Sequence, residues 1–291
     1  MKYVKVNKII KFSNVDGPGN RMSIFFQGCN YNCLYCHNPE TISKCNSCGI
    51  CVEICPVKAL SIVKSKIVWN KKKCINCDRC IGICKNNSSP KTLDYSVEEL
   101  LKEVKKVSGF IRGITVSGGE AILNYEFITQ LFKEVKKLGL TTFVDTNGSL
   151  DLSYDIYNEF IYATDKFMVD MKVWDEKAHN NLTGYGNVEV IKNIEFLGNL
   201  GKLYEVRTVV VPNLLDNVET VTKISEIVGK INLKNQLNED IIYKLIKYRE
   251  MGVRKEILEM ELSNSISPGE NIMKELSKVV RDNKVEKVII I

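Results

Sequence analysis

Cysteine is the residue type with the clearest chemistry in this sequence. Cys29, Cys33 and Cys36 lie in one short loop, at spacings of four and three residues. Soft thiolate ligands select iron–sulfur clusters or zinc, and a 4Fe–4S cluster normally takes four of them. No fourth cysteine lies near enough in the sequence to complete this set. We therefore expect a cluster in which one iron stays open to a small molecule.

The other eight cysteines form a doubled motif. Each run reads Cys-x2-Cys-x2-Cys-x3-Cys; the first is followed by Pro56, and the second by Lys85 in place of a proline. This pattern is typical of bacterial two-cluster ferredoxins, in which the fourth cysteine of each run ligates the other cluster. We assign one 4Fe–4S cluster to Cys45, Cys48, Cys51 and Cys84. We assign the second to Cys74, Cys77, Cys80 and Cys55.

Zinc is the alternative metal at all three predicted cluster sites. Structural zinc sites more often use two separated Cys-x2-Cys pairs, which the doubled run does not resemble. If zinc were bound by Cys29, Cys33 and Cys36, His37 would have to be the fourth ligand. It directly follows Cys36, and adjacent residues seldom point at one metal.

Small and polar residues follow three apolar runs that we predict to be strands. These groups are Ser117-Gly118-Gly119-Glu120, Asp145-Thr146-Asn147-Gly148 and Asp170-Met171-Lys172. Glycines let a backbone approach a ligand closely, and Glu120 adds an acceptor for an ammonium group. The alternatives are plain turns for the first two groups and a surface ion pair for Asp170 and Lys172.

Arg207 lies inside an apolar run, Val206 to Val211. An unpaired charge is costly to bury, so Arg207 requires a partner. The partner could be the carboxylate of a ligand, a strand-end acid such as Asp170, or an acid in a purely structural pair.

The elements that must position these residues alternate along the chain. We predict strands over Lys8–Ser13, Arg21–Gly28, Ile111–Ser117, Leu140–Asp145, Lys166–Met171, Leu203–Val211, Ile241–Tyr248 and Val285–Ile291. We predict helices over Val97–Val107, Tyr125–Leu138, Leu152–Ala163, Val188–Leu200, Asn217–Val228 and Ile272–Arg281. Such alternation implies parallel strands joined by right-handed crossovers. About six units favour an α/β fold, a partial (β/α)6 TIM-type barrel formed by residues 1–38 and 91–291. Residues 39–90 are then a ferredoxin-like insertion with two 4Fe–4S clusters.

The composition is that of a globular chain of 291 residues, 44% hydrophobic and 26% charged, with a formal charge of +6. We interpret the lysines as solvated faces spread along helices, which argues against nucleic-acid binding. All 11 cysteines lie between Cys29 and Cys84, unlike a disulfide framework. The first residues lack the apolar core of a signal peptide, and no run approaches a membrane span. We expect a cytoplasmic protein without membrane contacts.

The motifs together resemble a known family. The cysteine spacing, with Tyr35 before the last cysteine, is similar to the cluster loop of the radical S-adenosylmethionine (SAM) enzymes. Asp16-Gly17-Pro18-Gly19-x-Arg21, His37-Asn38-Pro39 and the motifs above resemble the glycyl-radical-enzyme activating enzymes. Val68-Trp69-Asn70 and the residues from Ile114 to Ala121 look closest to the YjjW branch. The resemblance covers most of the chain and is thin beyond about Asn232.

The resemblance implies roles for individual residues. SAM would bind the open iron, with Ser117, Gly118, Gly119 and Glu120 at its amino group and Tyr35 and His37 near its adenine. Lys172 and Arg207 correspond to SAM-binding positions, and Asn147 and Met171 belong to the same strand-end motifs. Asp145, Thr146, Met168 and Asp170 correspond to a monovalent-cation site. The chain departs from the family at Arg249, where a histidine usually lies near SAM; a guanidinium does not lose its proton.

The resemblance also implies an activity. A 5′-deoxyadenosyl radical, formed by reductive cleavage of SAM, would take a hydrogen atom from a backbone glycine of a partner glycyl radical enzyme. A low-potential donor such as flavodoxin or ferredoxin would supply the electron in an anaerobic cytoplasm. The two further clusters would relay electrons or help to dock the partner. Alternatives are a radical SAM enzyme that acts on a small molecule or matures a metalloenzyme, and a simple electron carrier.

Overall fold

The computed structural model describes residues 2–235 and 240–291 of the chain. The chain divides into two compact units. The first comprises residues 1–30 and 38–140, and the second comprises residues 31–37 and 141–291. The cysteine loop that follows residue 30 therefore belongs to the second unit, although Cys29 belongs to the first.

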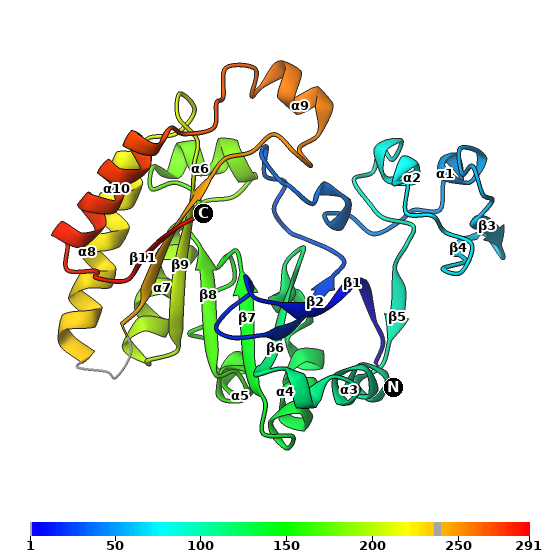
Figure 1. Ribbon diagram of the computed structural model, residues 1–291, viewed down its shortest axis with the longest axis horizontal. Helices are drawn as coiled ribbons and strands as arrows, with labels where there is room; N and C mark the ends of the chain where they lie inside the picture. The colour runs from blue at the N-terminus through cyan, green and yellow to red at the C-terminus, as the bar shows by residue number, and fades with distance from the viewer. Residues whose placement is uncertain (1, 236–239) are drawn as a thin grey trace. The chain divides into compact units, whose positions relative to one another are not determined.

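The first unit contains a mixed sheet of four strands in the order β6-β2-β1-β5 (Figure 1). The strands are β1 (Val4–Ser13), β2 (Arg21–Phe26), β5 (Leu93–Tyr95) and β6 (Gly113–Gly118). β2 and β6 are parallel, whereas β1 is antiparallel to both β2 and β5. Five of the six residues of β2 are buried, as expected for a strand covered on both faces.

Two helices of the first unit, α3 (Val97–Lys105) and α4 (Tyr125–Lys136), pack against each other. α3 begins at a capping box, in which Ser96 and Glu99 satisfy each other's backbone N–H groups. The ring of Phe127 on α4 meets that of Phe26 on β2 edge to face at 6.3 Å. These contacts place α4 against the strand that leads to Cys29.

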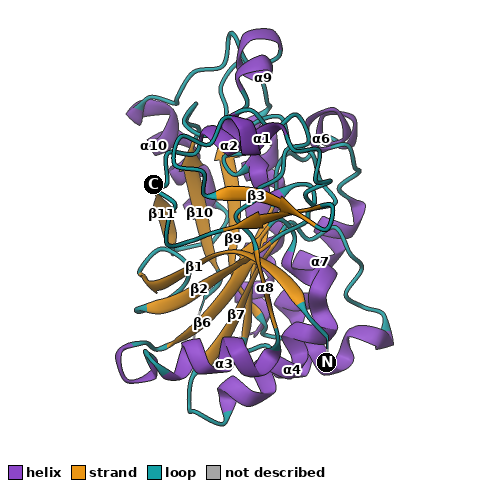
Figure 2. Ribbon diagram, turned by 90° about the vertical axis from the view of Figure 1, so that its right-hand side faces the viewer, coloured by secondary structure: helices purple, strands orange, loops and turns teal. Residues whose placement is uncertain are grey.

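The segment between β2 and β5 holds only short elements. These are α1 (Ile50–Glu53), β3 (Leu60–Val63), β4 (Lys66–Trp69) and α2 (Arg79–Gly82). Figure 1 shows them in one part of the first unit, and Figure 2 shows α1, α2 and β3 near one another. β3 and β4 pair as an antiparallel hairpin. Between Cys45 and Cys84, the buried apolar residues are Cys51, Ala59 and Leu60. So small a core rarely holds a fold without metals or disulfides.

The second unit contains a parallel sheet in the order β11-β10-β9-β8-β7. Its strands are β7 (Thr141–Thr146), β8 (Lys166–Asp170), β9 (Leu203–Val210), β10 (Ile242–Lys247) and β11 (Val288–Ile290). The connecting helices include α5 (Asn158–Ala163), α7 (Val188–Asn199), α8 (Asn217–Asn235) and α10 (Glu270–Asp282). The predicted α/β alternation and parallel strands are confirmed in this unit.

Some helix predictions were wrong. The helix predicted from Leu152 begins only at Asn158, because side chains hold the preceding residues in turns. Asp151 accepts from the Ser153 N–H at 3.0 Å, and Asn193 accepts from the Leu152 N–H at 3.0 Å.

Two helices of the second unit were missed, α6 (Glu176–Thr183) and α9 (Lys255–Met260). α6 carries ordinary boundary signals: Asp175 caps its N-terminus by accepting from the Ala178 N–H at 2.7 Å, and Gly184 ends it in a left-handed conformation. Within the described residues, no helix has both the length and the apolarity to cross a membrane.

Candidate active site

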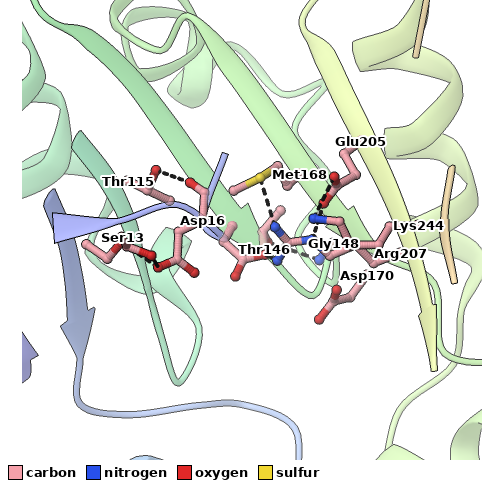
Figure 3. Close-up of polar contacts among 12 residues, drawn as sticks. Ser13, Asp16, Thr115, Thr146, Gly148, Met168, Asp170, Glu205, Arg207 and Lys244 are labelled. Carbon is pink, nitrogen blue, oxygen red and sulfur yellow. Dashed lines mark hydrogen bonds and ion pairs between the residues drawn. The ribbon is translucent and has the colours of Figure 1, made fainter. Parts of the chain in front are cut away.

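A row of charged side chains lies toward the carboxyl ends of the parallel strands in the second unit (Figure 3). Asp145 is in β7, Asp170 ends β8, Arg207 is in β9 and Lys244 is in β10. The register pairs Arg207 with Asp170 on one side and with Lys244 on the other. Because side chains alternate along a strand, Glu205 shares the face of Arg207.

Arg207 is held by a buried network. Its Nη1 donates to Asp145 at 2.9 Å, its Nε donates to Glu205, and its Nη2 lies 3.0 Å from the Sδ of Met168. Lys244 donates to the second oxygen of Glu205 at 2.8 Å. Burial disfavours the charged guanidinium, but the carboxylates of Asp145 and Glu205 outweigh it and raise the pKa of Arg207. The prediction that Arg207 needs a partner is confirmed.

The partners of Arg207 were only partly anticipated. Asp170 was the strand-end acid named from the sequence, whereas the structure bonds the guanidinium to Asp145 and Glu205. Sequence reasoning missed Glu205 and Lys244. The usable signal was a second charge, two residues before Arg207 in the same apolar strand.

Asp170 and Lys172 do not form a surface pair, so that alternative was wrong. The Lys172 ammonium lies 2.7 Å from Asp170, and the two side chains are 13% and 28% exposed. Lys172 also lies 6.0 Å from the centre of the Tyr35 ring. Burial disfavours the ammonium, but the nearby Asp170 carboxylate raises the pKa of Lys172 well above its ordinary value. A permanent positive charge therefore lies beside the cysteine loop.

The loop of residues 31–37 is fixed by elements far along the chain. The backbone N–H groups of Asn32 and Leu34 donate to the last turn of α6, at 2.9 Å each. Arg254, at the start of α9, donates to the Asn32 side chain at 2.9 Å and to the Cys33 carbonyl at 3.1 Å. Both helices absent from the sequence prediction thus hold the predicted cluster loop.

Within this loop, Cys33 and Tyr35 are buried. Burial raises the pKa of the Cys33 thiol to about 11, and the neighbouring Lys172 opposes the rise. The Tyr35 ring packs in an apolar cluster that includes Val173 and Tyr248. The Tyr35 hydroxyl has no hydrogen-bond partner within the described residues.

His37 closes the loop through a backbone contact. Its Nε2 lies 2.8 Å from the carbonyl oxygen of Arg249; because a carbonyl only accepts, this nitrogen carries the proton. Burial lowers the pKa of His37. A side chain at Gly252 would place its Cβ 2.3 Å from the His37 carbonyl oxygen. The segment around Arg249, where the sequence departs from the family, is therefore packed against the loop.

In the first unit, Gly118 and Gly119 hold the strand that leads to Cys29. The Gly119 N–H donates to Phe26 at 3.0 Å, and the Glu120 N–H donates to Gly28 at 2.8 Å. A Cβ on Gly119 would lie 2.1 Å from the Gly28 oxygen and 2.9 Å from the Cys29 nitrogen. The glycine pair thus permits a close approach of two backbones.

Other predicted site residues have local partners. Glu120 is buried and accepts from the Ile122 N–H at 2.9 Å. Thr146 and Asn147 accept from backbone N–H groups two residues ahead, at 3.0 Å each, so they also shape the turn after β7. Ser117 and Met171 are buried.

The motif from Asp16 to Arg21 ties β2 to β6. Asp16 accepts from Ser13 at 2.6 Å, and its carbonyl accepts from Thr115 at 2.6 Å (Figure 3). Arg21 is fully buried and donates to Thr115 at 2.8 Å and to the Ile114 carbonyl at 2.7 Å. These contacts fix the amino end of the strand that carries Cys29.

Two cavities in the segment between β2 and β5 are each lined by four cysteines. The larger, of about 260 Å³, is lined by Cys45, Cys48, Cys51 and Cys84. The smaller, of about 20 Å³, is lined by Cys55, Cys74, Cys77 and Cys80. Each cavity is thus lined by the four cysteines that the doubled motif groups into one predicted ligand set.

The sequence profile of the Radical SAM superfamily matches residues 23–224. The chain belongs to the radical SAM superfamily. Among its relatives, the trans-4-hydroxy-L-proline dehydratase activating enzyme of Clostridioides difficile is 32% identical over 84% of each chain. The pyruvate formate-lyase 1-activating enzyme of Escherichia coli is 28% identical over 86% of this chain and 83% of its own.

A solved structure extends the comparison of folds. The crystal structure of QueE from Escherichia coli aligns with a TM-score of 0.50, covering 99% of this chain and 94% of that one. At 12% identity, it bears on the fold alone.

A radical SAM protein carries a 4Fe–4S cluster and SAM, and the residues of this chain fit such groups. Cys33 supplies a buried thiol; burial favours its neutral form, and the positive charge of the nearby Lys172 offsets part of that effect. Lys172 and Arg207 supply buried cations for a carboxylate, and both are already oriented by acids. No three His, Cys, Asp or Glu side chains in residues 2–235 and 240–291 are arranged to hold a single metal ion.

Proposed function

We propose that this protein activates a glycyl radical enzyme. A 4Fe–4S cluster held by Cys29, Cys33 and Cys36 would pass one electron to bound SAM, which would break its S–C5′ bond and give methionine and a 5′-deoxyadenosyl radical. That radical would take a hydrogen atom from a backbone glycine of the partner enzyme. The observation that carries this proposal is the juxtaposition of the half-buried Lys172–Asp170 pair with Cys33 and Tyr35 of the cysteine loop. The relatives named as activating enzymes support the choice of partner.

The residues of the chain divide the binding task. Cys29, Cys33 and Cys36 hold the open cluster, and Tyr35 and His37 lie on the adenine side. Ser117, Gly118, Gly119 and Glu120 receive the amino group of SAM. Lys172 and Arg207 receive its carboxylate. Asn147 and Met171, which follow β7 and β8, are further SAM-binding residues in this proposal.

A monovalent cation would bind at Asp145, Thr146, Met168 and Asp170. It would share two of these side chains with Arg207, because the guanidinium already contacts Asp145 and Met168. We therefore expect the cation and the guanidinium to contribute positive charge to the same place.

The architecture we propose is a partial (β/α)6 barrel formed by residues 1–38 and 91–291. Residues 39–90 form a ferredoxin-like insertion with two 4Fe–4S clusters, so the protein holds three. The two four-cysteine cavities and the small apolar core of this segment support the insertion. A flavodoxin or ferredoxin would supply the electron, in an anaerobic cytoplasm.

The test is SAM cleavage by the reconstituted protein under anaerobic conditions. With dithionite and SAM, the wild type should form 5′-deoxyadenosine, measured by chromatography. Cys33→Ala should abolish the product, whereas Cys48→Ala, in the larger cavity, should keep it because dithionite reduces the open cluster directly. Cleavage by Cys33→Ala at the wild-type rate would overturn the proposal.

A further inference from the structure

The net charge of the protein is concentrated in the insertion. Residues 39–90 contain nine of the 41 Lys and Arg but three of the 35 Asp and Glu, which leaves 32 of each elsewhere. The formal charge of +6 therefore lies in less than a fifth of the chain. The earlier interpretation, that the lysines are only spread along helices, was wrong for this segment.

Much of this charge gathers at the smaller cysteine cavity. Lys71, Lys72 and Lys73 immediately precede Cys74, and all three side chains are exposed. Ile75, which follows Cys74, is 61% exposed. A single exposed apolar side chain is ordinary on a protein surface, so the three adjacent positive charges are the feature that points to a partner. We call residues 71–75 the basic loop.

A groove of about 490 Å³ adjoins the basic loop. Trp69, Asp78 and Lys91 line both this groove and the smaller cysteine cavity. Lys91 is paired with Asp78, so these two charges offset each other. The groove therefore opens from the surface beside the second cluster site.

The larger cysteine cavity is linked to Cys29 through backbone hydrogen bonds. The N–H groups of Gly28 and Cys29 donate to Thr41 and Ile42, at 2.8 Å each. Cys45 follows Ile42 by three residues, which span at most about 11 Å. The cluster held by Cys45 is thus tied to the open cluster's first ligand, and the basic loop belongs to the other cluster.

We propose that a small acidic electron-carrier protein docks on the basic loop. It would pass one electron to the cluster at Cys55, Cys74, Cys77 and Cys80. The carrier is oxidised by one electron and the cluster is reduced by one; no bond or proton is exchanged. The electron then moves through the cluster at Cys45 toward Cys29. This inference rests on the proposed function, and it assigns the insertion the role of a relay.

Charge complementarity favours an acidic partner, because opposite charges steer encounter and fix orientation. The competing explanation is that the lysines only offset the negative charge of the thiolate-bound clusters. The two explanations differ in what a change of charge does. Docking predicts a loss of carrier affinity, whereas charge compensation predicts a shift of the cluster's reduction potential at unchanged affinity.

The experiment compares two triple variants of the three-cluster protein. Lys71→Glu/Lys72→Glu/Lys73→Glu alters the basic loop. The control, Lys223→Glu/Lys274→Glu/Lys278→Glu, makes the same charge change at exposed positions of α8 and α10. The probe is an acidic flavodoxin, and its Kd is measured by calorimetry from about 20 to 200 mM salt.

We expect the basic-loop variant to bind flavodoxin at least about tenfold more weakly at low salt, and the control within about twofold of wild type. The flavodoxin affinity of the Lys71→Gln/Lys72→Gln/Lys73→Gln variant should fall between those of the basic-loop variant and the control. Such a graded loss separates an effect of charge from misfolding of the glutamate variant. Unchanged affinity in the basic-loop variant, or an equal loss in the control, would overturn the inference. So would a shift in cluster potential without a change in Kd.

A kinetic arm separates this inference from the proposed function. Reduction of the clusters by flavodoxin should be at least about tenfold slower in the basic-loop variant, while SAM cleavage with dithionite stays within about twofold of wild type. Loss of the dithionite reaction in the basic-loop variant alone would overturn the docking role. Its absence in the wild type would instead overturn the proposed function.

Discussion

At the scale of single residues, the site is built from charges that the fold could not bury alone. Arg207 is 9% exposed and Glu205 is 1% exposed; Arg207 is paired with Asp145 and Glu205, and Glu205 is also paired with Lys244. Removing one member of a buried ion pair leaves an uncompensated charge, which is strongly destabilising. The network therefore fixes the position of the Arg207 guanidinium.

Arg207→Met should weaken both folding and SAM cleavage. The change leaves Asp145 and Glu205 without their shared cation, and we expect the free energy of unfolding to fall by about 3 kcal/mol. Urea unfolding under anaerobic conditions measures this, with Arg281→Met on the exposed side of α10 as control. A loss as small as that of the control would contradict the network's role.

Gly119→Ala tests the close approach beside Cys29. The added Cβ would lie 2.1 Å from the Gly28 oxygen, so the backbone before Cys29 must move. We expect about four irons fewer per chain, since one 4Fe–4S cluster is lost, and no SAM cleavage. Iron analysis measures this loss. Gly109→Ala is the matched control, because a Cβ there meets nothing within 4 Å; full iron content in Gly119→Ala would refute this account.

At the scale of elements, the sequence predicted strands better than the helices that support the site. Apolar runs marked β2 and β6 to β10, and their polar ends marked most of the site residues. The helix α6 was missed because only two of its eight residues, Ala178 and Leu182, are apolar, and its docking against residues 32–34 is a tertiary contact. The same applies to Lys244, whose role depends on strand register and on Glu205.

His179 on α6 gives this contact a pH dependence. Its Nδ1 donates to the Tyr185 carbonyl at 2.7 Å, its buried Nε2 has no partner within the described residues, and the Tyr31 ring lies 5.7 Å away. Burial lowers the pKa of His179 below its ordinary 6.5. Protonation therefore favours the unfolded chain, and stability present above pH 6.5 is lost as the pH falls below it.

His179→Asn should flatten this dependence. Between about pH 7.5 and 5.5, the free energy of unfolding of the wild type should fall more steeply than that of the variant. His37, the other histidine, is common to both proteins and cancels in the comparison. Equal slopes in anaerobic urea titrations would show that His179 is not held neutral by the fold.

At the scale of the whole molecule, the cysteine pattern carried the most information. It predicted two sets of four cysteines as cluster ligands, and each set lines one cavity in residues 39–90. The sequence could not show how residues 249–254 pack on the cysteine loop, since that contact joins segments more than 200 residues apart. The concentration of charge in residues 39–90 was readable from the start, but its meaning needed the location of the cavities.

The most direct measurement is electron paramagnetic resonance of a glycyl radical enzyme after anaerobic incubation with this protein, SAM and dithionite. The partner should be one whose gene lies beside that of this chain. The account predicts a glycyl doublet on the partner, together with 5′-deoxyadenosine, and neither signal with the Cys33→Ala variant. Formation of 5′-deoxyadenosine without any glycyl doublet would contradict the activating role.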